Sequence, residues 1–179
     1  YYACNENRLI EAKGFGLKTQ EDIKKAIEFS IANQGWFLYA KVMPSALEVI
    51  QHLEKTLPLA PISFTGDYRR KSEVLQHVQI LIAAEPSQVH QAIKSLEYEF
   101  DINKENQRIS FKDQNGIPFE VLTCGVDEYA KNLLISTGSE EHIKQLEEIA
   151  EIQNLDSENE IYRSLGLAYI EPELRESGN

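Results

Sequence analysis

Apolar residues recur with two different periods along the chain, and the first change of period falls near Ile62. Residues 5–35 show helical spacing on both sides of the sequence Gly14-Phe15-Gly16. Thr19 is a good helix N-cap and Gly35 a good helix terminator, so this segment predicts a helix, a tight turn and a second helix. The pattern is that of a helix-hairpin-helix.

A further helix is predicted from Pro44 to Thr56, because Leu47, Ile50 and Leu53 repeat at helical spacing and proline suits a first turn. From Ile62 onward, alternating or β-branched runs bounded by turn residues predict strands within residues 62–70, 74–84, 108–116 and 117–124. Between the second and third of these runs, residues 85–98 predict a helix that starts at Pro86.

Asn115-Gly116 is a strong hairpin signal between the last two predicted strands. Beyond Cys124 the helical period returns in residues 126–137, 139–153 and 157–167. The sequence therefore predicts an α+β fold, helical at both ends, with one small mixed sheet between Ile62 and Cys124.

The net charge of −11 is unevenly distributed, because residues 125–179 hold four Lys or Arg against thirteen Asp or Glu. Proteins that bind DNA normally place a basic surface where they meet phosphate, so this C-terminal third is a poor DNA clamp. No apolar run approaches the length that spans a bilayer, and a cytoplasmic location is expected. The two cysteines, Cys4 and Cys124, are far apart and predict free thiols.

Four segments in order carry a family resemblance: "KGFGLKT" from residue 13, "GDYRRKSEVLQHVQILI" from residue 66, "TGSEEHIKQLEEIA" from residue 137 and "NEIYRSLGLAYIEPELRE" from residue 159. Together they resemble the family-X DNA polymerases, in the bacterial form that carries a phosphoesterase domain after its polymerase core. The resemblance implies helix-hairpin-helix fingers in residues 1–57, a nucleotidyltransferase palm in 58–124 and a thumb in 125–179. The chain begins Tyr1-Tyr2 and ends in "ESGN", so we expect further domains on both sides in a longer protein.

In active members of that family three aspartates hold two Mg²⁺ ions, since hard cations prefer carboxylate oxygens. The resemblance places those positions at His77, Gln79 and Glu120, of which only one is a carboxylate. We therefore expect no bound metal cofactor and no intact catalytic residue. His77 with Glu120 also offers too few ligands for a transition metal.

The resemblance also marks remnants of the triphosphate and sugar sites. A family serine that helps to hold the triphosphate is replaced by Asp67, and an aromatic pair that packs on the sugar is replaced by Ile135-Ser136. A family asparagine at the base edge falls at Ile143, and a template-facing arginine near Glu147. What remains of the phosphate and nucleotide site is the set Gly66, Asp67, Arg69, Arg70, Gly138 and Ser139.

For the basic pair in this set, residual phosphate binding competes with a simpler interpretation. We favour ion pairs of Arg69 and Arg70 with Asp67, Glu73 or Glu120, left by an abandoned site. Trp36 is expected to be a core anchor between fingers and palm rather than a platform for base stacking. The histidines in helical segments are expected at the surface: His52, His90 and His142.

The hairpin "GFGLKT" can bind a DNA backbone phosphate through its amides and a lysine, or can be only a tight interhelical turn. The residues predicted to contact the DNA backbone are Gly14, Gly16, Lys18 and Thr19. Neighbouring acidic residues offset the lysines, so any DNA affinity is expected to be weak and salt-sensitive.

The favoured interpretation is a non-catalytic DNA-binding or scaffolding core for DNA repair, which holds a C-terminal phosphoesterase domain near DNA ends. One alternative is an active DNA-directed DNA polymerase that recruits metal through Glu120 and unrecognised carboxylates such as Asp67. Another is a protein-protein interaction module in which the acidic thumb meets a basic partner.

Overall fold

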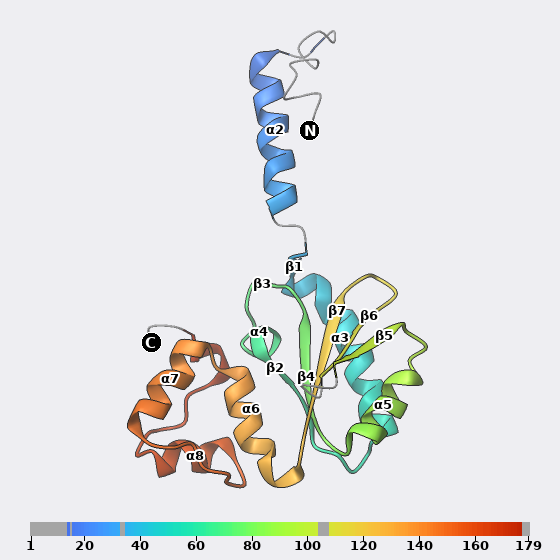
Figure 1. Ribbon diagram of the computed structural model, residues 1–179. Helices are drawn as coiled ribbons and strands as arrows, with labels where there is room; N and C mark the ends of the chain where they lie inside the picture. Colours follow the sequence, from blue (N-terminus) through green and yellow to red (C-terminus); the bar gives the residue numbers. More distant parts are fainter. Residues whose placement is uncertain (1–13, 15, 33–34, 104–107, 177–179) are drawn as a thin grey trace. The chain divides into compact units, whose positions relative to one another are not determined.

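The computed structural model describes residues 14, 16–32, 35–103 and 108–176 (Figure 1). The chain divides into two compact units, Tyr1–Trp36 and Phe37–Asn179. The predicted palm and thumb segments both fall in the second unit, whereas the predicted fingers boundary at residue 57 does not coincide with the division. The division into fingers, palm and thumb stays a prediction.

In the first unit the described helix is α2 (Leu17–Ala32). The amide of Gln20 donates to the carbonyl of Gly16 at 3.0 Å, so the helix begins two residues before Thr19. The prediction that Thr19 is the N-cap is therefore wrong. Gly14 has a φ of 98°, a left-handed conformation that favours glycine and fits the predicted turn. The helix predicted before this turn lies outside the described residues.

The second unit combines one sheet with helices. Its elements, in chain order, are β1 (Phe37–Leu38), α3 (Tyr39–Thr56), β2 (Ile62–Thr65), α4 (Gly66–Arg69), β3 (Val74–Leu75), β4 (Val78–Ala83), α5 (Pro86–Lys94), β5 (Phe100–Asn103), β6 (Arg108–Lys112), β7 (Pro118–Cys124), the 3₁₀-helix η1 (Val126–Glu128), α6 (Tyr129–Thr137), α7 (Glu140–Ile149), α8 (Glu158–Ser164) and the 3₁₀-helix η2 (Pro172–Leu174).

The main sheet has the strand order β2-β4-β7-β6-β5, in which β4 and β7 are parallel and the other neighbours are antiparallel. A separate short pair joins β1 to β3. The α+β prediction with a small mixed sheet between Ile62 and Cys124 is confirmed. The hairpin predicted at Asn115-Gly116 joins β6 to β7, and Gly116 has a φ of 75°.

One face of the sheet forms the larger core. A row of apolar side chains crosses all five strands and packs against buried residues of α3 and α5: Phe64, Ile80, Val121, Ile109 and Ile102. Burying such a row drives the packing of these helices, at about 25 cal/mol for each Å² of apolar surface removed from water. Figure 1 shows α3 and α5 on one side of the sheet, and α6, α7 and α8 on the other.

A smaller core joins the three C-terminal helices. It contains Ala130, Leu134, Ile143, Leu146, Ile152, Ile161, Tyr162 and Leu165. Ser139 and Ser157 cap α7 and α8, because each side chain accepts a hydrogen bond from a first-turn amide. Helix α6 also contacts β2 and β4, so this helical part rests on the sheet face opposite to α3 and α5.

Three details differ from the sequence predictions. Helix α3 begins at Tyr39, so Pro44 lies inside it, at an exposed position where proline has no amide to donate to the carbonyl of Ala40. Leu47, which shares the helical spacing of Ile50 and Leu53, is 43% exposed and does not share their burial. Trp36 is 44% exposed, so the expectation of a buried anchor is wrong.

Candidate functional site

A polar row crosses the sheet on the face opposite to α3 and α5. The strand register places Thr65, Gln79, Glu120, Ser110 and Asp101 side by side, in that order. Successive residues of a strand point to opposite faces, so these five positions alternate with the apolar row of the core. The row marks the face that carries the predicted metal positions.

The structure brings together the three predicted metal positions. Gln79 donates from Nε2 to Oε2 of Glu120 at 2.6 Å, and Nε2 of His77 lies 3.7 Å from the same oxygen. His77 is not part of a strand, because β3 ends at Leu75 and β4 begins at Val78. The three positions are therefore neighbours in the structure, although His77 does not lie in a continuous strand as the sequence predicted.

Sequence reasoning missed the cation in this cluster. Nη1 of Arg108 donates to Oε1 of Glu120 at 3.0 Å, so each carboxylate oxygen already accepts a hydrogen bond. Arg108 lies on β6, directly across from Leu122 and next to the polar row. The signal available in the sequence was the hairpin itself, because its register fixes which residues of β6 approach Glu120. In the described part of the chain, no group of three or more His, Cys, Asp or Glu side chains is arranged to hold a metal ion.

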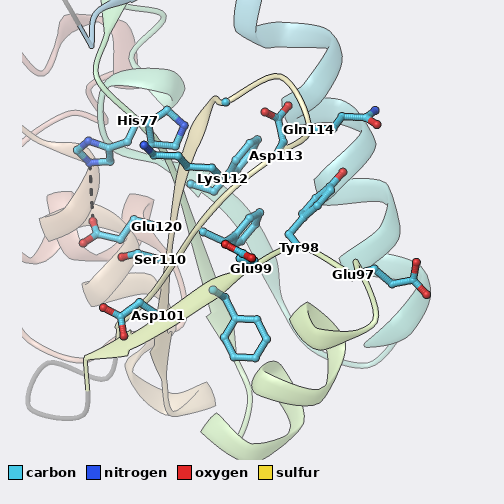
Figure 2. A pocket seen from close by; sticks show the side chains of 15 residues that line it. His77, Glu97, Tyr98, Glu99, Asp101, Ser110, Lys112, Asp113, Gln114 and Glu120 are labelled. Atoms are coloured by element: carbon cyan, nitrogen blue, oxygen red, sulfur yellow. Dashed lines mark ion pairs between the residues drawn. The ribbon is translucent and has the colours of Figure 1, made fainter.

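Two cavities meet at His77, which lines both. The smaller, of about 580 Å³, is also lined by Asp67, Arg70, Gln79 and Ser139. The larger, of about 930 Å³, is also lined by Glu120 (Figure 2). In Figure 2 the side chains of His77 and Glu120 point toward one another, and Asp101 and Ser110 lie on the same open face. The three predicted metal positions therefore lie at the boundary of the two cavities, and neither cavity is lined by all three residues.

Gly66 suits the turn that starts α4 for two reasons. Its φ of 60° is a left-handed conformation that favours glycine. A Cβ added there would lie 2.1 Å from Oε1 of Gln79, so a larger residue would displace the Gln79 side chain from its place beside Glu120. Gly138 is similarly confined, because an added Cβ would lie 2.7 Å from Cδ1 of Ile143.

Both arginines of the basic pair are engaged in ion pairs. Arg70 binds the carboxylate of Asp67, one of the expected partners, and its Nε donates to Glu176 at 2.8 Å. Its Nη1 also donates to the carbonyl of Thr137 at 2.6 Å. Arg69 binds Glu158 through two hydrogen bonds of 2.9 and 2.6 Å.

Glu73 and Glu120 were the alternatives to Asp67 as expected partners of the basic pair. Among the described residues, Glu73 and Glu120 form no ion pair with either arginine, and Glu120 pairs with Arg108 instead. Glu158 and Glu176 lie 89 and 106 residues from their partners, so no local pattern in the sequence pointed to them.

The residues predicted to contact DNA backbone lie at the start of α2 and are exposed: Gly14, Gly16, Lys18 and Thr19. A Cβ added at Gly14 or Gly16 would have no atom within 4 Å, so the backbone at this turn is open to a ligand. These residues belong to the first compact unit, whereas the cluster around Glu120 belongs to the second.

His142 was expected at the surface, but the structure shows it buried. Its Nε2 lies 2.8 Å from the hydroxyl of Tyr162 in the smaller core. Burial, and secondarily the nearby charge of Arg175, lower the pKa of His142 below its usual value of 6.5. Burial also raises the pKa of Tyr162 to about 12. His142 therefore stays neutral in the folded protein at pH 7.

This depressed pKa predicts acid sensitivity. Between the folded-state pKa and 6.5 the unfolded chain binds a proton that the folded chain excludes, so the free energy of unfolding falls as pH drops below 6.5. We expect His142→Gln to reduce that loss between pH 7.5 and 5.5 by roughly 1 kcal/mol, measured by urea unfolding. Gln145→Ala, at an exposed position of the same helix α7 and without a titratable group, is the control and should keep the original pH slope. An unchanged slope in the His142 variant would contradict the prediction.

In the described part of the chain, no helix is both long enough and apolar enough to cross a membrane.

The fold and the cluster define an α+β unit in which a basic turn borders a polar sheet face. No protein-family profile matches the chain.

The chain is similar to the DNA polymerase/3′-5′ exonuclease PolX of Bacillus subtilis (strain 168), with 27% identity over 201 aligned positions. The alignment covers 98% of this chain and 35% of the Bacillus protein, so the chain spans about a third of that relative's length. This similarity supports the resemblance to family-X polymerases that the sequence motifs indicated.

Proposed function

We propose that this chain is a family-X-like polymerase core that does not transfer nucleotides and acts as a DNA-binding and scaffolding region in DNA repair. The Bacillus relative, whose name states polymerase and exonuclease activities, supports a DNA-related role. Its greater length fits a chain that works beside further domains, and we propose that a phosphoesterase domain follows this core.

The observation that carries the proposal is the state of Glu120. Its two carboxylate oxygens accept hydrogen bonds from Gln79 and Arg108, and His77 lies beside them. A pair of Mg²⁺ ions needs several carboxylate oxygens, and a guanidinium close to the remaining carboxylate repels a second cation. The residues present therefore do not fit the two metal ions of an active family member, and we propose that none is bound.

The residues at the proposed triphosphate site are likewise occupied by contacts within the chain. The carboxylates of Asp67 and Glu176 neutralise Arg70, and Glu158 holds Arg69. Ser136 is bound to the hydroxyl of Thr65 at 2.6 Å, and Ile143 packs in the core of the C-terminal helices. Buried Ile143 offers no surface for a base, and the Ser136 hydroxyl is already bound, so these positions support the loss of nucleotide binding.

We propose that DNA contacts the hairpin at Gly14, Gly16, Lys18 and Thr19. Open backbone amides and Lys18 can bind a phosphate, whereas the acidic C-terminal helices repel the duplex. The interaction is therefore weak, with an apparent Kd on the order of 10⁻⁵ M at physiological salt, and it weakens further as salt rises.

Primer extension on a gapped template, with Mg²⁺ or Mn²⁺ and all four dNTPs, tests the catalytic half of the proposal. We expect no product above a no-enzyme control. Template-dependent extension would instead favour the active polymerase that recruits metal through Glu120 and Asp67.

Fluorescence anisotropy with gapped DNA tests the binding half. Lys18→Gln should weaken binding, whereas Lys144→Gln, which removes one exposed charge from α7, should not. If no DNA is bound at any salt concentration, the DNA-binding role is wrong, and a protein partner for the acidic helices becomes the better interpretation.

A further inference from the structure

Strand β5 (Phe100–Asn103) lies at one edge of the main sheet and is paired on one side, with β6. Figure 1 shows it as the outermost strand next to β6. An edge strand presents backbone amides and carbonyls with which a further extended segment can pair. Among the described residues no strand pairs with the second side of β5, so a partner strand can add to the sheet here.

The apolar face of the sheet is incompletely covered at this edge. Phe100 lies in register with Phe111, which in turn lies opposite Phe119. Phe111 and Phe119 are 4% and 1% exposed, whereas Phe100 and Ile102 are only partly buried. A sixth strand beside β5 would bring apolar side chains next to Phe100 and Ile102 and so bury surface that now meets water.

Acidic side chains alternate with these apolar ones. Glu97, Glu99 and Asp101 are exposed and line the 930 Å³ cavity, and Figure 2 shows them along the segment that leads into β5. Within the described parts of the chain none of the three forms an ion pair. The amide of Ile102 donates to Oδ1 of Asp101 at 2.8 Å, which orients this carboxylate without neutralising its charge. Glu99 and Asp101 are two residues apart, the spacing of side chains on one face of an extended chain.

The charge of this edge decides which strand can add to it. A second copy of the chain, paired through its own β5, would bring acidic residues opposite acidic residues, and like charges across two strands are destabilising. The phosphates of DNA are repelled for the same reason. An extended segment with lysine or arginine at every second position would place cations opposite Glu99 and Asp101, and its intervening apolar residues beside Phe100 and Ile102.

The neighbouring cavity suits the side chains of such a segment. Its lining includes one lysine, Lys112, and five carboxylates: Glu97, Glu99, Asp101, Asp113 and Glu120. Tyr98, which also lines it, stacks on Phe111 with ring centroids 5.8 Å apart, so this aromatic wall is held in place. Burial, and secondarily the charges of Glu48 and Asp113, raise the pKa of Tyr98, so negative charge surrounds this ring. A cation that lies against an aromatic ring near carboxylates is attracted by both.

We propose that β5 is a docking edge for an extended basic segment of another protein, which adds to the sheet as a sixth strand and places lysine or arginine side chains beside Glu99 and Asp101. The free strand edge requires an extended backbone, and the acidic positions require positive charge at every second residue. The competing explanation is that these acidic residues only keep copies of the chain from pairing edge to edge. The proposal goes beyond the proposed function and does not depend on DNA binding.

The probe for this edge is a fluorescently labelled octapeptide in which lysine and valine alternate. The control peptide has the same composition in block order, with all lysines before all valines, so that it carries the same charge without the period of a strand. Fluorescence anisotropy measures the affinity, and amide hydrogen exchange in residues 100–103 reports whether the peptide pairs with β5. We expect the alternating peptide to bind at least about fivefold more tightly than the block peptide and to slow exchange in β5.

Variants of the chain test the role of charge. Glu99→Gln/Asp101→Asn should weaken binding of the alternating lysine peptide by about fivefold or more. The control Glu148→Gln/Glu160→Gln, which removes two exposed charges from α7 and α8, should change it by less than about twofold. Glu99→Lys/Asp101→Lys should reject the lysine peptide and bind instead an octapeptide in which glutamate and valine alternate. All four positions are exposed, so we expect these variants to fold.

Three results would overturn the docking edge. Equal affinity for the alternating and block peptides would show attraction without strand pairing, and unchanged hydrogen exchange in β5 would show binding elsewhere. Equal losses in the two neutralised variants would show that Glu99 and Asp101 have no special role. If the parent chain binds neither peptide and Glu99→Gln/Asp101→Asn self-associates in analytical ultracentrifugation, the acidic residues only keep copies apart, and the proposal is wrong.

Discussion

The variant His77→Asp/Gln79→Asp, which places a carboxylate beside Glu120 at each of the two other metal positions that the resemblance implies, is expected to show no primer extension. We expect its rate to stay at least about a thousandfold below that of an active family member in the same assay, which corresponds to about 4 kcal/mol of activation free energy. The reason is that metal ligands are only one of the missing parts. Arg108 still binds Oε1 of Glu120 and supplies a positive charge where a cation would have to enter.

Positioning of the nucleotide is the other missing part. Ile143 is buried among the C-terminal helices, and Ser136 is held by Thr65 and by the carbonyl of Asn132. Ile143 cannot reach a base without unpacking α7, and Ser136, which borders the 580 Å³ cavity, has only a small side chain to offer a sugar. Loss of positioning alone can cost several kcal/mol of the barrier, because the reacting groups are no longer held at the distance of attack.

The matched control for this experiment is His77→Asn/Gln79→Asn, which has nearly the same shape without the charges. Binding of Mn²⁺, followed by electron paramagnetic resonance, should increase in the aspartate variant over the asparagine variant even though extension stays absent. Adding Arg108→Ala should raise Mn²⁺ binding further. Robust extension by the aspartate variant alone would show that the nucleotide site is still competent, and that the chain lost its activity only at the metal.

Local patterns in the sequence were sufficient for most of the fold. Helix α5 starts at Pro86 as predicted, and the predicted hairpin joins β6 to β7. These features depend on residues close together in the chain, such as the glycine with positive φ at position 116. Gln79 and Glu120 were placed together by the family resemblance rather than by a local pattern, and in the structure the parallel pairing of β4 with β7 sets them side by side.

Elements whose stability comes from distant partners were missed. Strand β5 has the sequence FDIN at the sheet edge, too short and too polar to stand out, and it exists because it pairs with β6. Pro44 was interpreted as a helix start, but α3 begins at Tyr39, whose amide donates to the carbonyl of Glu73. Helix propensity alone does not reveal such a tertiary anchor.

The same limit applied to the site. His142 follows two glutamates and precedes Ile143 and Lys144, a pattern typical of an exposed turn of helix, yet Tyr162 and Arg175 cover it. Arg108 was absent from the predicted site because its role depends on the β6–β7 register. Whether charged groups meet across 89 residues, as Arg69 and Glu158 do, is decided by packing and has no signature in a single sequence.

The buried arrangement of Arg69, Glu158 and Arg175 leads to the second large prediction, which concerns stability. Glu158→Gln keeps the shape of the side chain but leaves two largely buried guanidinium groups without a counter-charge. Removing one member of such a network typically costs about 3–5 kcal/mol, a large part of the 5–15 kcal/mol that holds a domain folded. Urea unfolding at pH 7 should therefore show a strongly lowered midpoint, whereas Glu160→Gln, exposed on the same helix turn, should change it little.

The pH dependence gives this prediction a second readout. Burial raises the pKa of Glu158, but hydrogen bonds and charge from Arg69 and Arg175 outweigh burial, so its pKa lies below the usual 4.5. A carboxyl with a lowered folded-state pKa contributes stability that is fully present above 4.5 and is lost as pH falls through the folded-state value. The difference in unfolding free energy between the parent chain and Glu158→Gln should accordingly be largest near pH 7 and shrink in acid below the folded-state pKa. A variant as stable as the parent at pH 7, or a difference that grows in acid, would mean that the three charges do not hold α4 to α8.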